Sequence, residues 1–208
     1  MRPAARHLER LLGRLGFRGV AGVDEAGMGP LAGPVVAAAV ILPTTGRVPA
    51  VADSKTLRPT ARAQLARSIR RSGCAVGVGV VEPPEIDRLN IYHAGIEAMR
   101  RALARLPEGG VDFVLVDGRE IGGLEQPQAA FPKADSFVAS VAAASIIAKV
   151  ARDGIMTDLD HTYPAYGFAK HMGYPTPAHL AALGRHGPCP AHRRSFAPVA
   201  FCELRGEL

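Results

Sequence analysis

Residues 19–42 read GVAGVDEAGMGPLAGPVVAAAVIL, two apolar segments joined by a glycine-rich turn. The segments Gly19–Glu25 and Pro34–Leu42 are rich in Val and Ala and are bounded by Gly and Pro, which predicts two short β-strands. Because their connection is short, we expect the strands to pair antiparallel. Asp24 and Glu25 end the first strand beside apolar residues, where crowded carboxylates repel each other and are costly to desolvate. This arrangement predicts a bound cation.

The composition is that of a globular protein. The chain has 208 residues, of which 48% are hydrophobic and 21% charged, and this length suits one domain of roughly 100 to 200 residues. We therefore predict a single domain over residues 1–208, with a basic N-terminal helix at about 4–16 and a helical, basic C-terminal extension at about 160–208. We also expect a monomer in the cytoplasm without membrane contact, because the chain lacks a long uncharged apolar stretch and a secretory signal.

The charge pattern favours a polyanionic partner. The formal net charge is +6, which fits a nucleic acid, although a basic surface that only confers solubility is the alternative. Arginines also recur every fourth residue over the first eighteen residues, at Arg2, Arg6, Arg10, Arg14 and Arg18. This stripe can be a solvated helix face, a phosphate contact or part of a targeting peptide.

The rest of the chain alternates strand and helix patterns, so the fold class is mixed α/β. We predict strands at Cys74–Val81 and Phe113–Val116 and a loop over Gly118–Lys133. Helices are predicted at Pro59–Arg71, at Pro84–Leu106 with a break near Asn90, at Phe137–Asp160 and at Pro177–Arg185. The many small residues of the long helix favour close packing on a sheet.

Four acidic residues stand at the ends of these elements. Asp24 and Glu25 close one strand, Asp117 closes another, and Asp135 precedes the long helix. Converging carboxylates could hold two Mg²⁺ or Mn²⁺ ions, which orient a water and stabilise a leaving oxygen in phosphodiester hydrolysis. Each acid taken singly is more simply a helix cap or a surface charge. Only the combination indicates a metal site.

Two features test that interpretation. Neighbouring residues of a regular strand point to opposite faces, so the strand must bend or end if both Asp24 and Glu25 are to reach one site. Gly27 and Gly29 make a bend possible. The same glycines do not form a dinucleotide-binding motif, because the spacing is GxGxxxG and Pro30 stands where free amides would be needed.

Cysteines and histidines give no metal signature. Cys74, Cys189 and Cys202 are widely spaced, without a CxxC pair, and free thiols are the simplest interpretation. Histidines gather towards the C-terminus, but their spacing matches neither a zinc finger nor HExxH. These histidines are His171, His179, His186 and His192.

Several motifs together resemble a known family. The stretch GVDEAGMGPLAGPVVAAAVIL resembles the opening of bacterial ribonuclease HII. The resemblance continues in order through DSKTL at Asp53–Leu57, LNIYHA at Leu89–Ala94, LVDG at Leu115–Gly118, KADSFVASVAAASIIAKVARD at Lys133–Asp153, YGFAKHMGYPT at Tyr166–Thr176 and HRRSFAPV at His192–Val199. Because the matches run from about residue 19 to about residue 199, they are more specific than any single motif.

The resemblance implies a ribonuclease H-like fold, with a mixed sheet of about five strands flanked by helices and a C-terminal helical extension. It also implies an endoribonuclease that hydrolyses the RNA strand of RNA/DNA hybrids and incises 5′ of ribonucleotides embedded in duplex DNA. Cleavage by a two-metal-ion mechanism would leave a 3′-hydroxyl and a 5′-phosphate. Asp24, Glu25, Asp117 and Asp135 match the family's catalytic, metal-binding acids, and the cofactor would be Mg²⁺ or Mn²⁺.

The resemblance further implies a set of substrate contacts. The turn at Gly27–Gly29 aligns with a glycine-arginine-glycine motif whose backbone senses the ribose 2′-hydroxyl, and Tyr174 aligns with a tyrosine that stacks near the ribonucleotide. Cationic side chains would contact phosphates. The implied substrate-binding residues are Gly27, Met28, Gly29, Lys55, Ser145, Lys149, Arg152, Tyr174, Arg193 and Arg194.

Met28 departs from the pattern, because the family usually has arginine there. The change removes a charge and five potential donors while the backbone amides of Gly27 and Gly29 remain. We therefore expect ribonucleotide sensing to persist with a weaker grip on phosphate. Two other classes stay open: a hybrid-binding protein with weak hydrolysis because of Met28, and a two-metal phosphohydrolase acting on small nucleotides.

Overall fold

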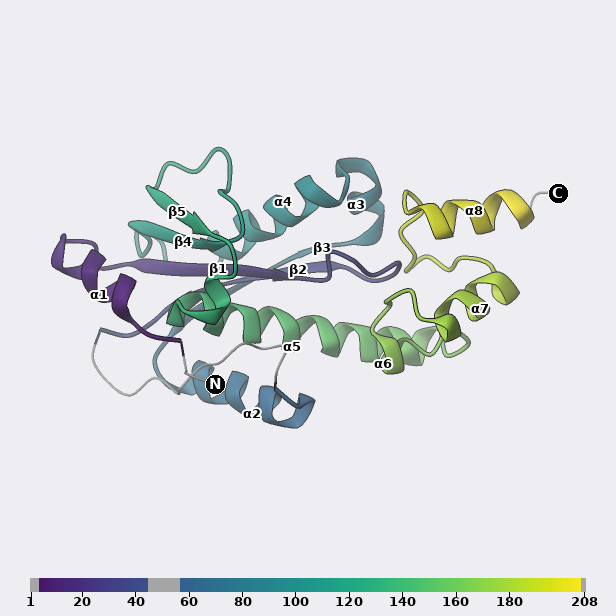
Figure 1. Cartoon of the computed structure of the whole chain (residues 1–208), viewed down its shortest axis with the longest axis horizontal. Helices are drawn as coiled ribbons and strands as arrows, with labels where there is room; N and C mark the ends of the chain where they lie inside the picture. The colour runs from purple at the N-terminus through teal and green to yellow at the C-terminus, as the bar shows by residue number, and fades with distance from the viewer. Residues whose placement is uncertain (1–3, 45–56, 207–208) are drawn as a thin grey trace.

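The protein is described by a computed structural model that covers residues 4–44 and 57–206. A five-stranded mixed sheet forms its centre, in the order β3-β2-β1-β4-β5 (Figure 1). The strands are β1 (Val20–Ala26), β2 (Val35–Ile41), β3 (Ala75–Val81), β4 (Phe113–Asp117) and β5 (Gln128–Phe131). β2 pairs antiparallel with both β1 and β3, whereas β4 pairs parallel with both β1 and β5. The predicted antiparallel pairing and the mixed five-stranded sheet are confirmed.

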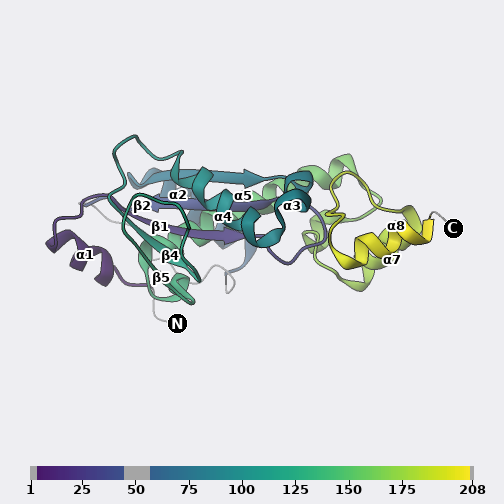
Figure 2. The same ribbon diagram turned by 90° about the horizontal axis from the view of Figure 1, so that it is seen from above.

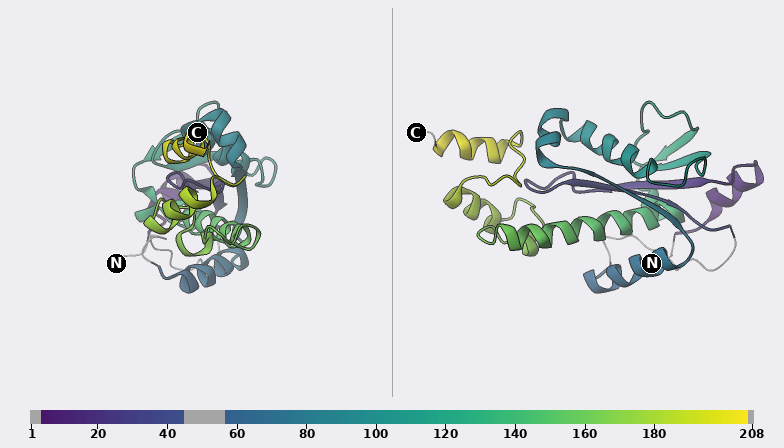
Figure 3. Two further views of the ribbon diagram at one scale, coloured as in Figure 1. Left: turned by 90° about the vertical axis from the view of Figure 1, so that its right-hand side faces the viewer. Right: turned by 180° about the vertical axis from the view of Figure 1, so that it is seen from behind.

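Helices cover both faces of the sheet. α3 and α4 lie on one face, and the long α5 crosses the other with α2 beneath it (Figure 1). α6, α7 and α8 lie together beyond one end of the sheet, at the opposite end of the molecule from α1 (Figures 2 and 3). The helices are α1 (His7–Arg14), α2 (Pro59–Arg71), α3 (Pro83–Leu89), α4 (Ile91–Leu103), α5 (Ala139–Thr162), α6 (Phe168–His171), α7 (Pro177–His186) and α8 (Ala197–Gly206). None of these helices, over the ranges described, is long and apolar enough to cross a bilayer.

The predicted helix break at Asn90 is confirmed. Asn90 has a positive φ of 64°, and its side chain accepts a hydrogen bond from the backbone N–H of His93 at 3.1 Å, which caps α4. The predicted loop over residues 118–133 is wrong in part, because it contains β5. β5 has only four residues, all half-buried, and its apolar run of Ala129, Ala130 and Phe131 is too short for sequence to identify as a strand. The helix α8 lies within the predicted C-terminal helical extension, but its own bounds were not predicted.

The N-terminal helix is shorter than the predicted range of about 4–16. The backbone of Ala5 instead pairs with residues preceding α5, forming an isolated bridge to Val138, so the chain is extended before α1 begins. The Glu9 carboxylate of α1 then accepts a hydrogen bond from the backbone N–H of Ser140 at 2.8 Å. This bond caps the start of α5, which has no capping side chain of its own. Arg2 lies outside the described residues.

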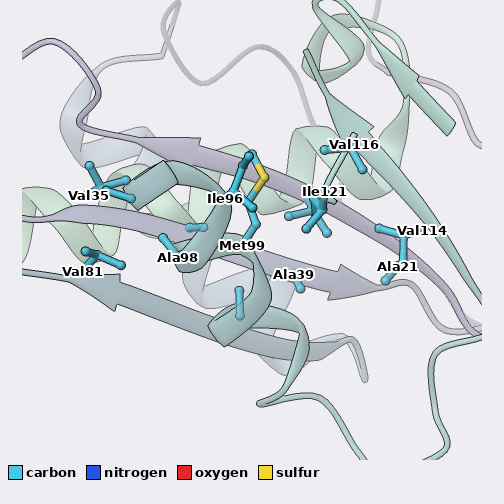
Figure 4. Packing of buried hydrophobic residues seen from close by; sticks show 14 of the residues in the cluster. Ala21, Val35, Ala39, Val81, Ile96, Ala98, Met99, Val114, Val116 and Ile121 are labelled. Carbon is cyan, nitrogen blue, oxygen red and sulfur yellow. The ribbon is translucent and has the colours of Figure 1, made fainter. Parts of the chain in front are cut away.

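Small residues determine how closely α5 approaches the sheet. Ala142, Ala143 and Ala144 are buried against β2 and α2. At Gly22 of β1, a Cβ atom would lie 2.2 Å from the carbonyl carbon of Ser140, so only glycine permits this contact. The predicted close packing of the long helix on the sheet is therefore confirmed. On the opposite face, aliphatic residues of the sheet and of α4 form the other large cluster (Figure 4).

Candidate active site

Three carboxylates converge where the carboxyl ends of β1 and β4 meet. Asp24 lies in β1, Asp117 is the last residue of β4, and Asp135 lies in the short 3₁₀ turn η2 (Ala134–Ser136). One carboxylate oxygen of each residue lies within 4.8 Å of the other two. The pairing of β1 with β4 explains the first two positions, because the preceding residues Val23 and Val116 are register partners. Parallel neighbouring strands thus bring their carboxyl ends together.

Asp135 reaches the cluster because β5, which runs parallel to β4, ends beside the carboxyl end of β4. β5 pairs with β4 so that Phe131 lies opposite Asp117, and the N–H of Gly118 donates to the carbonyl of Phe131 at 3.0 Å. The Asp117 carboxylate then accepts a hydrogen bond from the N–H of Ala134 at 2.6 Å. The edge strand missing from the prediction is therefore the element that delivers the third acid.

Glu25 is not a member of this three-acid group. β1 continues past Glu25 to Ala26, with Glu25 opposite Ala37 of β2, and the left-handed turn comes at Gly27, where φ is 95°. The bend thus lies two residues beyond Glu25. Its backbone N–H donates to the Asp24 carboxylate at 2.7 Å, and its charge acts on Asp24. A direct role of Glu25 in metal binding stays a prediction.

Burial and like charge make the cluster unfavourable without a cation. Asp24 is only 4% exposed. Burial raises its pKa well above the usual range, the negative charges of Glu25 and Asp117 raise the pKa further, and a hydrogen bond from Ser145 opposes the rise. A divalent cation would relieve this repulsion, and carboxylate oxygens are the ligands that Mg²⁺ and Mn²⁺ prefer. The residues therefore fit a divalent metal site.

Two buried arginines hold the turn that follows Asp24 and Glu25. Arg152 and Arg193 are both 0% exposed, and their guanidinium groups donate to backbone carbonyls at 2.7 to 3.3 Å. The acceptors are the carbonyls of Gly27, Met28, Ala32, Gly33, Pro34 and Met172. The predicted phosphate contacts of these two arginines are thus wrong, because buried guanidinium groups directed at carbonyls cannot meet a phosphate in solvent. Burial also lowers both pKa values, that of Arg193 to about 9.

The remaining predicted cationic contacts occupy different settings. The Lys149 ammonium forms a 2.7 Å ion pair with Asp153, which also pairs with Arg62 at 3.2 Å. The Arg194 side chain is 61% exposed and pairs with Glu203 at 2.7 Å. Lys55 lies outside the described residues. Arg194 is therefore placed to meet a ligand in solvent, whereas Lys149 would first have to leave Asp153.

Tyr174 and Gly29 form an accessible surface beside the turn. Tyr174 is 43% exposed, and a Cβ atom added at Gly29 would lie 3.7 Å from its ring carbon Cε1. Ser145 is only 5% exposed and hydrogen-bonds to Asp24, so it acts on the acid rather than lying open to a substrate. Met28 is half-buried, and its sulfur lies 3.1 Å from where a Cβ atom of Gly95 would be. Met28 therefore packs on α4.

Sequence reasoning missed the roles of two histidines. His179 and His192 are buried and hydrogen-bonded to each other, and His179 is also bonded to the carbonyl of Tyr174. The proximity of His179 to Tyr174 in the sequence was the available signal, but a search for zinc spacing does not detect a hydrogen-bonded pair.

Comparison with known proteins decides the family. The sequence profile described as Ribonuclease HII matches residues 21–201. The chain belongs to the ribonuclease HII family. A ribonuclease HII from Geobacillus thermodenitrificans is 52% identical over 92% of this chain and 73% of its own length. One from Syntrophotalea carbinolica is 48% identical over 93% of this chain and 92% of its own length. The crystal structure of ribonuclease H2 from Pyrococcus horikoshii matches with a TM-score of 0.77 at 28% identity, covering 90% of this chain and 98% of that one.

Membership of the ribonuclease HII family confirms the predicted fold and activity. The chain has the mixed five-stranded sheet, its flanking helices and the C-terminal helices, and the ribonuclease H2 structure matches 90% of it. The protein is a ribonuclease H, an endonuclease that hydrolyses RNA paired with DNA. Its acidic group indicates that the hydrolysis uses a divalent metal ion.

Proposed function

We propose that this ribonuclease H incises 5′ of single ribonucleotides embedded in duplex DNA, as well as within longer RNA/DNA hybrids, leaving a 3′-hydroxyl and a 5′-phosphate. Two Mg²⁺ or Mn²⁺ ions would be held by Asp24, Asp117 and Asp135 together with Glu25. The convergence of three acids from separate elements, within 4.8 Å of one another, carries the proposal. The chain would act as a monomer and one catalytic domain in the cytoplasm.

The acids would hold the cations, and the neighbouring residues would orient the substrate. When bound, divalent ions supply a nucleophilic water at neutral pH and stabilise the charge that develops on phosphate oxygens. The Ser145 hydroxyl, which hydrogen-bonds to the Asp24 carboxylate, orients that ligand oxygen. Asp117 holds η2 in place through its bond from Ala134, so one carboxylate both offers a metal ligand and positions Asp135.

Selectivity for ribose would come from the turn at Gly27–Gly29 and from Tyr174. The 2′-hydroxyl distinguishes RNA from DNA at a given site. A site built to hydrogen-bond a hydroxyl can reject the analogue that lacks it by about 10⁴ to 10⁵. The exposed Gly29 backbone beside the Tyr174 ring offers both a polar group and a stacking surface. This pairing supports sugar recognition without requiring an arginine at position 28.

A cleavage assay tests the proposal. Wild type and Asp24→Asn are incubated with Mg²⁺ or Mn²⁺ and a labelled duplex that carries one ribonucleotide, with an all-DNA duplex alongside. We expect wild type to cut only the first duplex, on the 5′ side of the ribonucleotide, and the new end to be extended by a DNA polymerase because it carries a 3′-hydroxyl. Asp158→Asn is the matched control, because Asp158 is an exposed acid of α5.

The outcomes separate the alternatives. Metal-dependent incision by wild type and Asp158→Asn, with none by Asp24→Asn, supports the proposal. Binding of the ribonucleotide duplex without incision by wild type would favour a hybrid-binding protein with weak hydrolysis. Incision by Asp24→Asn at the wild-type rate, or incision in EDTA, would overturn the assignment of the metal site.

A further inference from the structure

The backbone carbonyl of Tyr174 is held from inside the protein. Tyr174 lies in the connection between α6 and α7, and its carbonyl faces the N–H of Thr176 at 2.8 Å and Nδ1 of His179 at 2.9 Å. The Tyr174 ring, by contrast, is partly exposed beside Gly29. The internal bonds therefore set where an exposed ring stands.

A line of hydrogen bonds extends from this carbonyl through two histidines. Nε2 of His179 lies 3.1 Å from Nε2 of His192, and Nδ1 of His192 lies 3.0 Å from the backbone nitrogen of Cys189. Both rings are buried, His179 at 0% and His192 at 2% exposure. The line thus connects the segment before the C-terminal helix to Tyr174.

The line has one consistent set of proton positions. The backbone N–H of Cys189 can only donate, so Nδ1 of His192 accepts and a neutral His192 carries its proton on Nε2. That proton is donated to Nε2 of His179, which must then carry its own proton on Nδ1 and donate it to the carbonyl of Tyr174. Every polar atom of the two rings is satisfied when both are neutral.

A positive charge on either ring would break the line. Protonated His179 would present a second N–H to the N–H of His192, and protonated His192 would oppose the N–H of Cys189. The groups facing the pair are the stacked ring of His171 at 4.5 Å, the ring of Tyr166 at 4.9 Å and the Cys189 sulfur at 3.2 Å. None of these is a carboxylate, and burial raises the pKa of the Tyr166 hydroxyl and of the Cys189 thiol, so both stay neutral and cannot compensate the charge. Burial accordingly lowers the pKa of His179 and, with the neighbouring His179, lowers that of His192 to about 4.

We propose that His192 and His179 are positioning residues for ribonucleotide recognition, because their neutral hydrogen-bonded pair fixes the Tyr174 carbonyl and thereby the ring beside Gly29. This inference rests on the proposed function, in which Tyr174 contacts the sugar. The pair acts on substrate binding rather than on the metal-dependent step, since its bonds end at Tyr174 and not at the acids. Recognition of the ribonucleotide should therefore weaken as the pair becomes protonated in acid.

Two variants of His192 test the coupling to Tyr174. His192→Leu removes the donor to His179, whereas His192→Gln places an amide N–H near the same position. Affinity for the single-ribonucleotide duplex relative to all-DNA duplex is measured in the non-cutting Asp24→Asn protein. We expect His192→Leu to lower this ratio about tenfold, since it leaves a buried acceptor unpaired, and His192→Gln to restore most of it. His161→Leu, at an exposed histidine near the end of α5, should leave the ratio unchanged.

The decisive comparison repeats His192→Leu in a Tyr174→Ala background. If the histidines act through Tyr174, the tenfold loss disappears there, because coupled residues are not additive. An equal loss in both backgrounds would overturn the inference and leave the proposed function intact. Absence of any ribonucleotide preference in the parent protein would instead overturn the proposed function and, with it, this inference.

A spectroscopic measurement on wild type needs no core substitution and applies even if His192→Leu does not fold. Side-chain ¹H–¹⁵N spectra at pH 7 should show a proton on Nδ1 of His179 and on Nε2 of His192. The same spectra recorded at falling pH should change together with the affinity ratio. An imidazolium at neutral pH, the opposite tautomers, or an affinity ratio that does not follow the titration would each overturn the inference.

Discussion

Replacing Arg193 by lysine should destabilise the protein, whereas the same change at the adjacent Arg194 should not. Both residues are cations in the HRRSF motif, and sequence alone assigns both to phosphate. In the structure, Arg193 is buried and donates to four backbone carbonyls, whereas the side chain of Arg194 is 61% exposed and pairs with Glu203. The pair of substitutions therefore separates structural from surface roles at constant charge.

The magnitude follows from the bonds that lysine cannot make. A lysine ammonium has three donors on one atom and cannot span the separated carbonyls that the guanidinium reaches. If two of the four carbonyls lose their partner, at about 1 to 3 kcal/mol for each unsatisfied buried group, Arg193→Lys costs about 3 kcal/mol of unfolding free energy. For a chain of this size that lowers the Tm by about 6 to 12 °C. The exposed ion pair of Arg194 contributes less than about 1 kcal/mol.

Thermal and urea unfolding of the two variants measure this difference in stability. Hybrid binding at several salt concentrations measures whether either residue contacts phosphate. Arg193→Lys should keep the wild-type salt slope, because Arg193 contacts no phosphate, but it should lose ribonucleotide preference as the turn loosens. Equal stability of Arg193→Lys and Arg194→Lys would refute the structural role of the hydrogen bonds from Arg193 to the turn. A fall of about 0.9 in the salt slope for the Arg193 variant would restore the phosphate assignment.

Four further predictions concern the acids, Met28, the sheet contact and pH. Asp24→Asn should lower incision at least about a thousandfold, because metal ions supply several kcal/mol of charge stabilisation. In EDTA, however, the variant should unfold at a higher temperature than wild type, since the substitution removes a buried carboxylate from a like-charged cluster. Met28→Arg should tighten hybrid binding and steepen its salt slope by about 0.9, as one added phosphate contact predicts; an unchanged slope by anisotropy would rule out that contact. Gly22→Ala should lower the free energy of unfolding by about 3 kcal/mol or more through its clash with the backbone of Ser140. Gly184→Ala in α7, where a Cβ atom meets nothing within 4 Å, should be neutral or stabilising, and urea unfolding measures both variants. Because the pKa of His192 falls from 6.5 in the unfolded chain to about 4 in the native protein, the unfolded state takes up its proton first as the pH drops. Stability from this group is therefore complete above pH 6.5 and decreases by up to about 3 kcal/mol towards pH 4, a loss that urea unfolding should show to be smaller in His192→Gln.

The acids could be predicted from sequence because their positions depend on local patterns. A short apolar run that ends in an acid places that acid at or near the carboxyl end of a strand: Asp117 is the last residue of β4, and Asp24 lies two residues before the end of β1. The position of Asp135 could not be predicted by this rule, because the chain reaches it through β5, whose half-buried residues show no recognisable alternation. Its spacing from Asp117 was suggestive only through the family resemblance. Glu25 shows that the same rule also selects too many acids, because its sequence neighbour Asp24 belongs to the three-acid group and Glu25 does not.

The arginines could not be assigned from sequence, because a guanidinium suits a phosphate and a cluster of carbonyls equally well. What decides between them is burial, and burial at Arg193 depends on a contact with Gly27 that spans 166 residues. Packing likewise makes His179 and His192, whose spacing in the sequence matches no metal site, a neutral hydrogen-bonded pair. The acids of the proposed metal site are therefore placed by the carboxyl ends of β1 and β4 and by the short return through β5, while the turn and the tyrosine expected to read the sugar are placed by the distant C-terminal segment. Substitutions in that segment should accordingly alter which nucleotides the enzyme accepts more than how its metal-dependent chemistry proceeds.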